Sequence, residues 1–373
     1  MTLFADDTTR SDAGTGERAP RSRRVGWGLV AAAAVGTLVL SLLPSPYVIE
    51  QPGPVIDTLG DVTVAEESVP LISIPGEETF PTEGRLSLLT VNVVGNREQQ
   101  PTWFEVVTSW ADPSRAVVPV DAIYPEGQTV EQSNEQSAVD MENSQKDAVA
   151  ASLTELGYDF DSTLTVAASA PDSPADGVFV EGDEIVSVNG RAPVDVTELR
   201  SIIADNGTGS PVDIEVLRDG RETPLDVTPV MLEGSDQPVV GISVATEYDF
   251  PFDVEIQLER IGGPSAGMMF ALGIIDKLTP GSLTGGTNVA GTGTITADGL
   301  VGGIGGIRQK MYGAADDGAT LFLAPTANCD EVVGHVPDGL TVVAVETLDD
   351  SLEALETVAN GEDATDLPTC AAS

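Results

Sequence analysis

Apolar residues follow two different periods along the chain, and each period predicts a different element. Residues 86–94 read Leu-Ser-Leu-Leu-Thr-Val-Asn-Val-Val, with apolar residues alternating at the three positions Leu89, Val91 and Val93. This period of two predicts a strand. Residues 133–156 predict a helix that ends before Gly157. The C-terminal half of this helix carries one apolar side, formed by Ala148, Val149, Leu153 and Leu156.

The region 158–232 predicts short strands around one short helix. That helix covers 195–204, where Asp195 stands at the N-cap position and Glu198 follows three residues later, as in a capping box. Its inward side is predicted to consist of Leu199, Ile202 and Ile203. Segments that end in turn residues precede and follow it, which is typical of strands closing on tight turns.

The region 237–360 begins with an extended segment and continues into an apolar helix. Residues 254–259 alternate apolar and polar, and residues 266–277 carry Met268, Ala271, Leu272 and Ile275 at helical spacing before Pro280. Ser265, in the sequence Gly-Pro-Ser-Ala-Gly, therefore lies at a strand-to-helix junction. A serine at this position most often only caps the helix.

An uncharged apolar segment, 25–43, follows an arginine-rich N-terminus. Its 19 residues would form a helix about 28 Å long, which predicts a transmembrane helix. A cleaved signal peptide is the alternative, but its apolar part is normally shorter. The five arginines within 1–24 predict that this tail is cytoplasmic, so that everything from about residue 44 is extracytoplasmic and the protein is single-pass.

Composition narrows the choice of partners. The formal charge is −43, so binding to nucleic acid or anionic lipid through charge is disfavoured. The two cysteines, Cys329 and Cys370, can form a disulfide that ties down the acidic tail 361–373, or stay as two free thiols. The chain holds no Cys-x-x-Cys or Cys/His cluster, so we expect neither a metal nor a cofactor.

Three motifs in the second region occur as a set. They are Ser173-Pro-Ala175, then Gly182-Asp-Glu-Ile-Val-Ser-Val-Asn-Gly190, then Val216-Leu-Arg-Asp-Gly220. The set resembles a PDZ domain of the bacterial type. This resemblance implies that an extended peptide or unfolded protein binds alongside a sheet edge. The glycine loop that usually binds a peptide carboxylate is not evident before Ser173.

A nucleophilic Ser265 would need a base, and the chain offers one histidine and three lysines. His335 follows Ser265 with aspartates between them, so a Ser-His-Asp hydrolase or esterase is one reading. Lys146 lies in a polar part of a helix, and Lys277 lies about 18 Å along the helix axis from Ser265. Lys310 opens a helix after a glycine-rich segment, where the helix dipole and burial would lower its pKa.

Three glycine-rich blocks carry the decisive pattern. They are Gly262-Gly-Pro-Ser-Ala-Gly267, then Val289-Ala-Gly-Thr-Gly-Thr-Ile295, then Gly299-Leu-Val-Gly-Gly-Ile-Gly-Gly-Ile-Arg-Gln-Lys310. Their order and spacing resemble the proteolytic domain of the Lon protease family, which uses a Ser-Lys dyad. The resemblance implies Ser265 as nucleophile, Lys310 as general base and Thr292 as the residue that supports the lysine.

The same resemblance implies which groups hold the oxyanion, and this sequence departs from the family pattern at one position. The backbone N–H groups near Gly263 and Ser265 are expected to stabilise the oxyanion. Many Lon proteases carry an acid three positions before the serine, where this chain has Gly262, so that function is lost or transferred, for example to Glu259.

Together these features predict an α+β protein with a Lon-type proteolytic domain at 237–360, a PDZ-like β-rich module at 158–232 and one preceding transmembrane helix. Residues 44–157 are an extracytoplasmic segment that could form the N-terminal half of the protease fold. No Walker A motif occurs, so the expected activity is ATP-independent. The resemblance is to membrane-anchored Lon-like serine proteases of Gram-positive bacteria. Because Lon domains tend to form rings, the resemblance is compatible with a homo-oligomer. A non-catalytic peptide-binding scaffold is the rival hypothesis.

Overall fold

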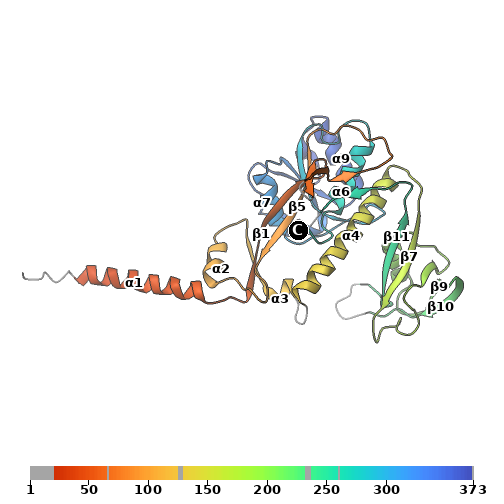
Figure 1. The fold of residues 1–373 in the computed structure, drawn as a ribbon, viewed down its shortest axis with the longest axis horizontal. Coiled ribbons are helices and arrows are strands. Elements are labelled where there is room, and N and C mark those ends of the chain that lie inside the picture. Colours follow the sequence, from red (N-terminus) through yellow and green to blue (C-terminus); the bar gives the residue numbers. More distant parts are fainter. Residues whose placement is uncertain (1–20, 65–66, 125–128, 232–236, 259–260, 372–373) are drawn as a thin grey trace, which may run out of the picture.

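The computed structural model describes residues 21–64, 67–124, 129–231, 237–258 and 261–371. Two sheets organise them, and both are visible in Figure 1. The cytoplasmic tail predicted for 1–24 lies almost wholly outside the described residues, as does Glu259.

The first sheet joins strands from the beginning and the end of the chain. Its order is β17-β16-β13-β5-β1-β6, and β5, β13, β16 and β17 run parallel. The strands are β1 (Tyr47–Asp57), β5 (Arg85–Val94), β6 (Ala116–Pro119), β13 (Asn288–Gly291), β16 (Leu321–Pro325) and β17 (Thr341–Val345). Residues 44–157 therefore share a sheet with residues 237–360, and the second sheet lies between them in the sequence.

Helices cover both faces of the first sheet, so its central strands are buried on both sides. Leu88 of β5 packs into one core with α6 (Gly267–Leu278), α4 (Val130–Glu155) and α9 (Leu348–Ala359). The next residue, Leu89, packs into another core with α7 (Ile307–Asp316) and α8 (Cys329–Val332). The predicted alternation in 86–94 thus gives a strand, but both of its faces are apolar.

The second sheet is antiparallel with the order β10-β9-β8-β7-β11. Its elements are β7 (Asp161–Ser169), β8 (Glu184–Val188), β9 (Val212–Arg218), β10 (Arg221–Val227), β11 (Ile242–Asp249) and α5 (Val196–Asn206). Asp195 caps α5 by accepting the N–H of Glu198, and the three inward residues predicted for this helix are buried. The prediction that residues from 237 onward belong to the proteolytic domain is wrong for β11, because β11 pairs with β7 along its whole length.

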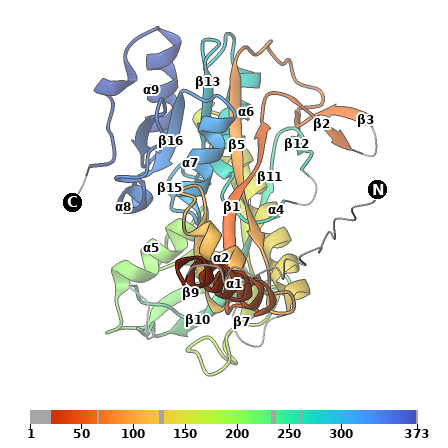
Figure 2. The same ribbon diagram turned by 90° about the vertical axis from the view of Figure 1, so that its left-hand side faces the viewer.

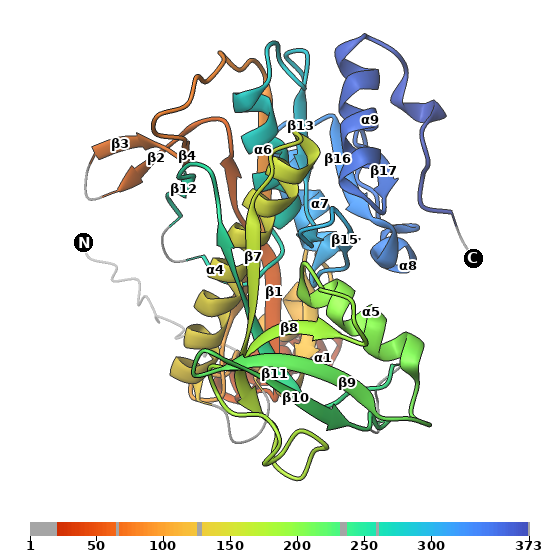
Figure 3. The same cartoon turned by 90° about the vertical axis from the view of Figure 1, so that its right-hand side faces the viewer.

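α4 connects the two sheets in space. Figure 3 shows it in yellow, running from the level of β7 up to α6. As predicted, Ala148, Val149 and Leu153 in its C-terminal half are buried, whereas Leu156 is only partly buried. The helix ends before Gly157, which has a φ of +75°. α6 differs from its prediction, since every residue from Gly267 to Asp276 is buried rather than one side only.

The remaining elements are short. They are β2 (Asp61–Val64), β3 (Glu67–Pro70), β4 (Ile72–Ser73), β12 (Glu255–Ile256), β14 (Thr294–Ile295), β15 (Val301–Gly302), α2 (Trp103–Ser109), α3 (Val120–Ile123) and the 3-10 turns Thr326–Asn328 and Ala364–Asp366. The acidic tail is attached rather than loose, because Cys370 forms a disulfide with Cys329 and the Pro368 carbonyl accepts the N–H of Ala344 at 2.8 Å.

The segment predicted to span a membrane forms most of helix α1 (Arg21–Leu42). Within the part of the chain that the structure describes, no helix combines the length and the apolar character that a membrane crossing needs. Figure 2 looks along α1 and shows α2 beside it.

Candidate functional site

Ser265 lies just before α6 and does not cap it. The N-cap residue is Ala266, and no side chain makes a capping hydrogen bond there. The Ser265 hydroxyl instead accepts a hydrogen bond from the Lys310 amine, with 2.9 Å between Oγ and Nζ. The ordinary structural role of a serine at such a junction therefore does not account for Ser265.

Lys310 reaches Ser265 from the opposite face of the first sheet. It occupies the first turn of α7, whose neighbouring residues Ile307 and Met311 are fully buried and fix the helix on the sheet. α7 begins after Gly306, which has a φ of +68° and whose absent Cβ would lie 2.6 Å from a methyl carbon of Val91. Glycine is thus needed there on both conformational and steric grounds.

Thr292 completes the cluster from the end of β13. Its hydroxyl accepts a second hydrogen bond from Lys310 Nζ at 2.9 Å and donates to the Ser265 carbonyl at 2.9 Å. The backbone N–H of Gly293 donates to the same carbonyl at 3.0 Å. Thr292 therefore orients the lysine and the serine backbone together.

Burial sets the charge of the cluster. Lys310 is 2% exposed and Thr292 is fully buried, whereas Ser265 is partly exposed. Removal from water lowers the pKa of the Lys310 amine from 10.5 to about 7. None of the described carboxylates forms an ion pair with it. Near neutral pH a large share of Lys310 is consequently uncharged, and its lone pair can accept the Ser265 proton.

A cavity of about 340 Å³ gives access to Ser265. Its walls come from β5, from the loop 261–266, from Gly305 and from Met141 of α4. Pairing between β13 and β5 stops at Leu88, so residues 89–92 of β5 line the cavity with one side of their backbone unpaired by any described strand. An extended peptide could pair with that side.

One predicted oxyanion group is engaged elsewhere. The N–H of Gly263 donates to the Ser137 carbonyl of α4 at 2.8 Å, so the prediction for Gly263 does not hold in this structure. The physical reason is the close packing of α4, which also leaves no room for a side chain at Gly262, whose Cβ would lie 2.7 Å from that of Ser137. No described residue accepts the N–H of Ser265 or Ala266, and both precede the N-terminus of α6.

α4 is the contribution to this site that sequence reasoning missed. Besides the Ser137 contact, the Ser144 hydroxyl donates to the Pro264 carbonyl at 2.8 Å, directly before Ser265. These contacts join residues about 120 positions apart, and the polar residues concerned look like an ordinary solvated helix side in the sequence.

The other candidate bases lie outside this cluster. Lys146 pairs with Glu142 on α4, and Lys277 lies near the C-terminus of α6. His335 bonds through Nδ1 to the Val333 carbonyl at 3.1 Å and does not line the cavity. The residues described contain no group of His, Cys, Asp and Glu suited to hold a metal ion.

A separate apolar groove of about 640 Å³ lies in the second sheet. It runs between α5, which contributes Leu199 and Ile203, and the segment 238–244 that leads into β11. β11 is the last strand of its sheet, so its outer edge is open to an additional strand. Gly241, which has a φ of +88°, lies in the wall of this groove.

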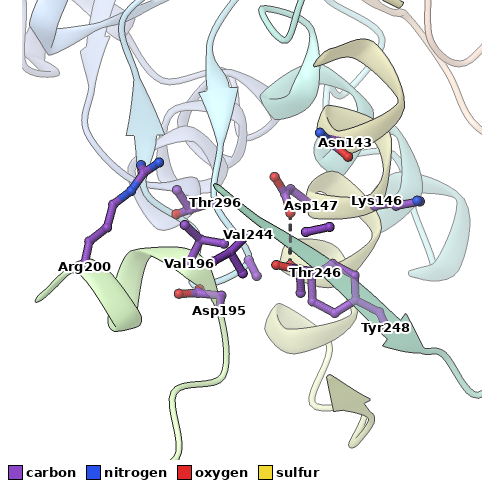
Figure 4. Close-up of a pocket in the computed structure, with 12 residues that line it drawn as sticks. Asn143, Lys146, Asp147, Asp195, Val196, Arg200, Val244, Thr246, Tyr248 and Thr296 are labelled. Carbon is purple, nitrogen blue, oxygen red and sulfur yellow. Dashed lines mark hydrogen bonds between the residues drawn. The ribbon is translucent and has the colours of Figure 1, made fainter. Parts of the chain in front are cut away.

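A polar pocket of about 230 Å³ lies between this groove and α4 (Figure 4). Val196, Arg200 and Val244 line both the groove and the pocket. Across it the Tyr248 hydroxyl donates to the Asp147 carboxylate at 3.0 Å, and burial raises the pKa of Asp147 to about 6. This bond ties β11 to the helix that holds the serine loop.

Two family models match separate parts of the chain. Residues 260–357 match the family described as Lon protease (S16) C-terminal proteolytic domain, and residues 136–228 match the PDZ domain family. The chain thus contains a region similar to the Lon-type proteolytic domain and a region similar to a PDZ domain.

Individual relatives cover parts of the chain. "Lon protease 2" of Herpetosiphon aurantiacus is 44% identical over 27% of this chain and 13% of its own length. "Lon protease 1" of Bacillus subtilis is 36% identical over 30% of this chain and 15% of its own length. A crystal structure of the PDZ domain of an SdrC-like protein from Listeria innocua aligns with 22% of this chain and 92% of that chain, with 21% identity and a TM-score of 0.21. The chain spans less than a quarter of the length of the curated relatives it matches.

Proposed function

We propose that this protein is an ATP-independent, membrane-anchored serine endopeptidase in which Ser265 is the nucleophile and Lys310 the general base. The observation that carries the proposal is the contact between the Ser265 hydroxyl, which does not cap α6, and the buried amine of Lys310, whose pKa falls to about 7. When Lys310 is neutral, the direction of this hydrogen bond can reverse, so that the Ser265 O–H donates to the lone pair of Nζ across the same 2.9 Å.

The reaction then proceeds through an acyl-enzyme. Ser265 Oγ attacks a peptide carbonyl while its proton passes to Lys310. The developing oxyanion lies against the N–H groups of Ser265 and Ala266 at the start of α6, which no described residue accepts. Lys310 returns the proton to the leaving amine. Water then attacks the acyl-enzyme with Lys310 again acting as base, which restores Ser265.

We propose extended peptide or unfolded protein as the substrate. Residues 89–92 of β5 offer an unpaired backbone edge beside Ser265, and the groove at β11 offers a second edge for a longer chain. Replacing half-buried Ile242 in the groove by arginine should weaken peptide capture by the Ser265→Ala protein. Val186→Arg, on an exposed position of β8, is the matched control and should leave capture unchanged.

The membrane anchor and extracytoplasmic location belong to this proposal. Support comes from the arginines before residue 25 and from the large apolar side chains that α1 exposes along its described length.

The experiment is to sequence the peptides released from a membrane fraction by the wild-type chain and by Ser265→Ala. The proposal expects products from the wild type only. Equal products from both, or peptide capture without cleavage by either, would favour the peptide-binding scaffold.

A further inference from the structure

All three tryptophans of the chain lie on α1, on α2 or at the residue directly after α2, although these helices make up a small part of the chain. Trp27 is near the start of α1 and 67% exposed, and Trp110 follows α2 and is 62% exposed. Trp103 opens α2 and is partly covered by Tyr47, with ring centroids 5.8 Å apart. Such exposure of the largest apolar side chains is unusual in a folded protein.

The exposed side of α2 carries three large apolar or aromatic side chains beside the polar Glu105 and Thr108. Phe104, Val107 and Trp110 follow each other at intervals of three residues and are 42%, 45% and 62% exposed, while Val106 on the other side is fully buried. The helix is well anchored, because Thr102 and Glu105 form a complete capping box. The side formed by Phe104, Val107 and Trp110, here called the α2 face, is therefore held in place with nothing described covering it.

α2 is attached directly to the C-terminal end of α1. The Trp103 N–H donates to the Leu43 carbonyl at 3.1 Å, and the Ser45 N–H donates to the Pro101 carbonyl at 2.8 Å. Figures 1 and 2 both show α2 beside that end of α1, between α1 and the rest of the protein. The α2 face therefore belongs to a helix that contacts α1, and α1 also exposes large apolar side chains.

The two levels of tryptophan match the dimensions of a bilayer. Trp27 and Leu43 are 16 residues apart, about 24 Å along a helix, and α2 lies beyond Leu43. A hydrocarbon core is about 30 Å thick, and tryptophan is enriched at both of its boundaries with water. We infer that the α2 face lies in the outer headgroup region of the membrane and holds the peptidase at a fixed height and orientation against the lipid surface. This inference rests on the proposed membrane anchor.

The test uses the full chain reconstituted in phosphatidylcholine vesicles, since a net charge of −43 makes anionic lipid a poor partner. Trp27→Phe with Trp103→Phe leaves Trp110 as the only fluorophore of its kind. Its emission should shift to the blue on reconstitution and be quenched more by lipid brominated near the headgroup than by lipid brominated near the chain ends.

Two matched chains make each outcome decisive. A control without the three native tryptophans and with Val336→Trp, at a position 42% exposed and far along the chain, should show neither effect. A chain that retains only Trp27 reports on α1 alone. Quenched Trp27 with unquenched Trp110 overturns the inference, and a blue shift of Trp110 without quenching assigns the α2 face to a second copy of the chain. Loss of quenching at both positions overturns the membrane anchor itself.

Discussion

Two lysines in this protein are withdrawn from water, but their surroundings differ. Lys310, in the first turn of α7, has two hydroxyl partners and no described carboxylate, and its pKa falls to about 7. Lys277, near the end of α6, is half-buried, and desolvation also lowers its pKa, but the carboxylates of Asp276, Asp61 and Asp57 act in the opposite direction. Burial without a neighbouring carboxylate lowers the pKa of Lys310 to about 7, whereas the carboxylates beside Lys277 oppose the same effect of burial on its pKa.

The largest effect on activity is expected when each of the two lysines is replaced in turn. Lys310→Met should lower peptidase kcat/KM by roughly 10⁴-fold, because Ser265 loses its base, and Lys310→Arg should be equally inactive because guanidinium stays protonated. Lys277→Met is the matched control and should retain activity within about three-fold. Comparable losses in both methionine variants would show that burial of a lysine, and not its contact with Ser265, determines activity.

Stability measurements test the physical cause of the low pKa. Unfolded Lys310 holds its proton up to about pH 10.5 and folded Lys310 only up to about pH 7, so the unfolded state binds more protons in that window. The free energy of unfolding of the wild type therefore contains a term that rises with pH from 7 to 10.5. Below pH 7, the lowered pKa of Lys310 reduces the free energy of unfolding by roughly 5 kcal/mol relative to its value above pH 10.5.

Lys310→Met lacks this term and should be more stable than the wild type at pH 6. Its advantage should shrink by several kcal/mol as the pH approaches 10.5, as measured by chemical denaturation of both proteins at each pH. An advantage that does not depend on pH would mean that folded Lys310 keeps an ordinary pKa.

Variants of Thr292 test how the position of Lys310 affects activity while the lysine itself is kept. Thr292→Val keeps the shape but removes the hydroxyl that holds Lys310 and the Ser265 carbonyl, so kcat should fall roughly 10- to 100-fold. Thr292→Ser restores the hydroxyl and should recover most of the loss. If the valine variant raises KM alone, Thr292 acts on substrate binding and not on the dyad.

The smallest expected effect is at the only histidine. His335→Ala should leave kcat/KM unchanged within about two-fold, because His335 contacts the Val333 carbonyl and not the Ser265 cavity. An inactive His335→Ala protein with normal stability would support the Ser-His-Asp reading and contradict the role given to Lys310.

Features that depend on neighbouring residues could be predicted from the sequence. Local motifs with glycine at required positions pointed to Ser265, Thr292 and Lys310, which the structure brings within hydrogen-bond distance. The N-cap of α5 and the end of α4 were predictable for the same reason, since they depend on neighbours in the chain.

Contacts between distant segments could not be predicted in this way. The pairing of β11 with β7, the burial of α6 on every side and the bond from Gly263 to Ser137 all depend on packing between elements far apart in sequence. Periodicity reports whether a residue is apolar, but it does not identify the surface that the residue meets.

The most direct measurement is the rate at which a serine-reactive probe modifies Ser265 as a function of pH, with the adduct located by mass spectrometry. Our account predicts labelling of the wild type that rises through about pH 7 as Lys310 loses its proton, no labelling of Ser265→Ala, and labelling of Lys310→Met that is both weak and independent of pH in this range. Equal labelling of Lys310→Met and the wild type, or an adduct at another serine, would contradict it.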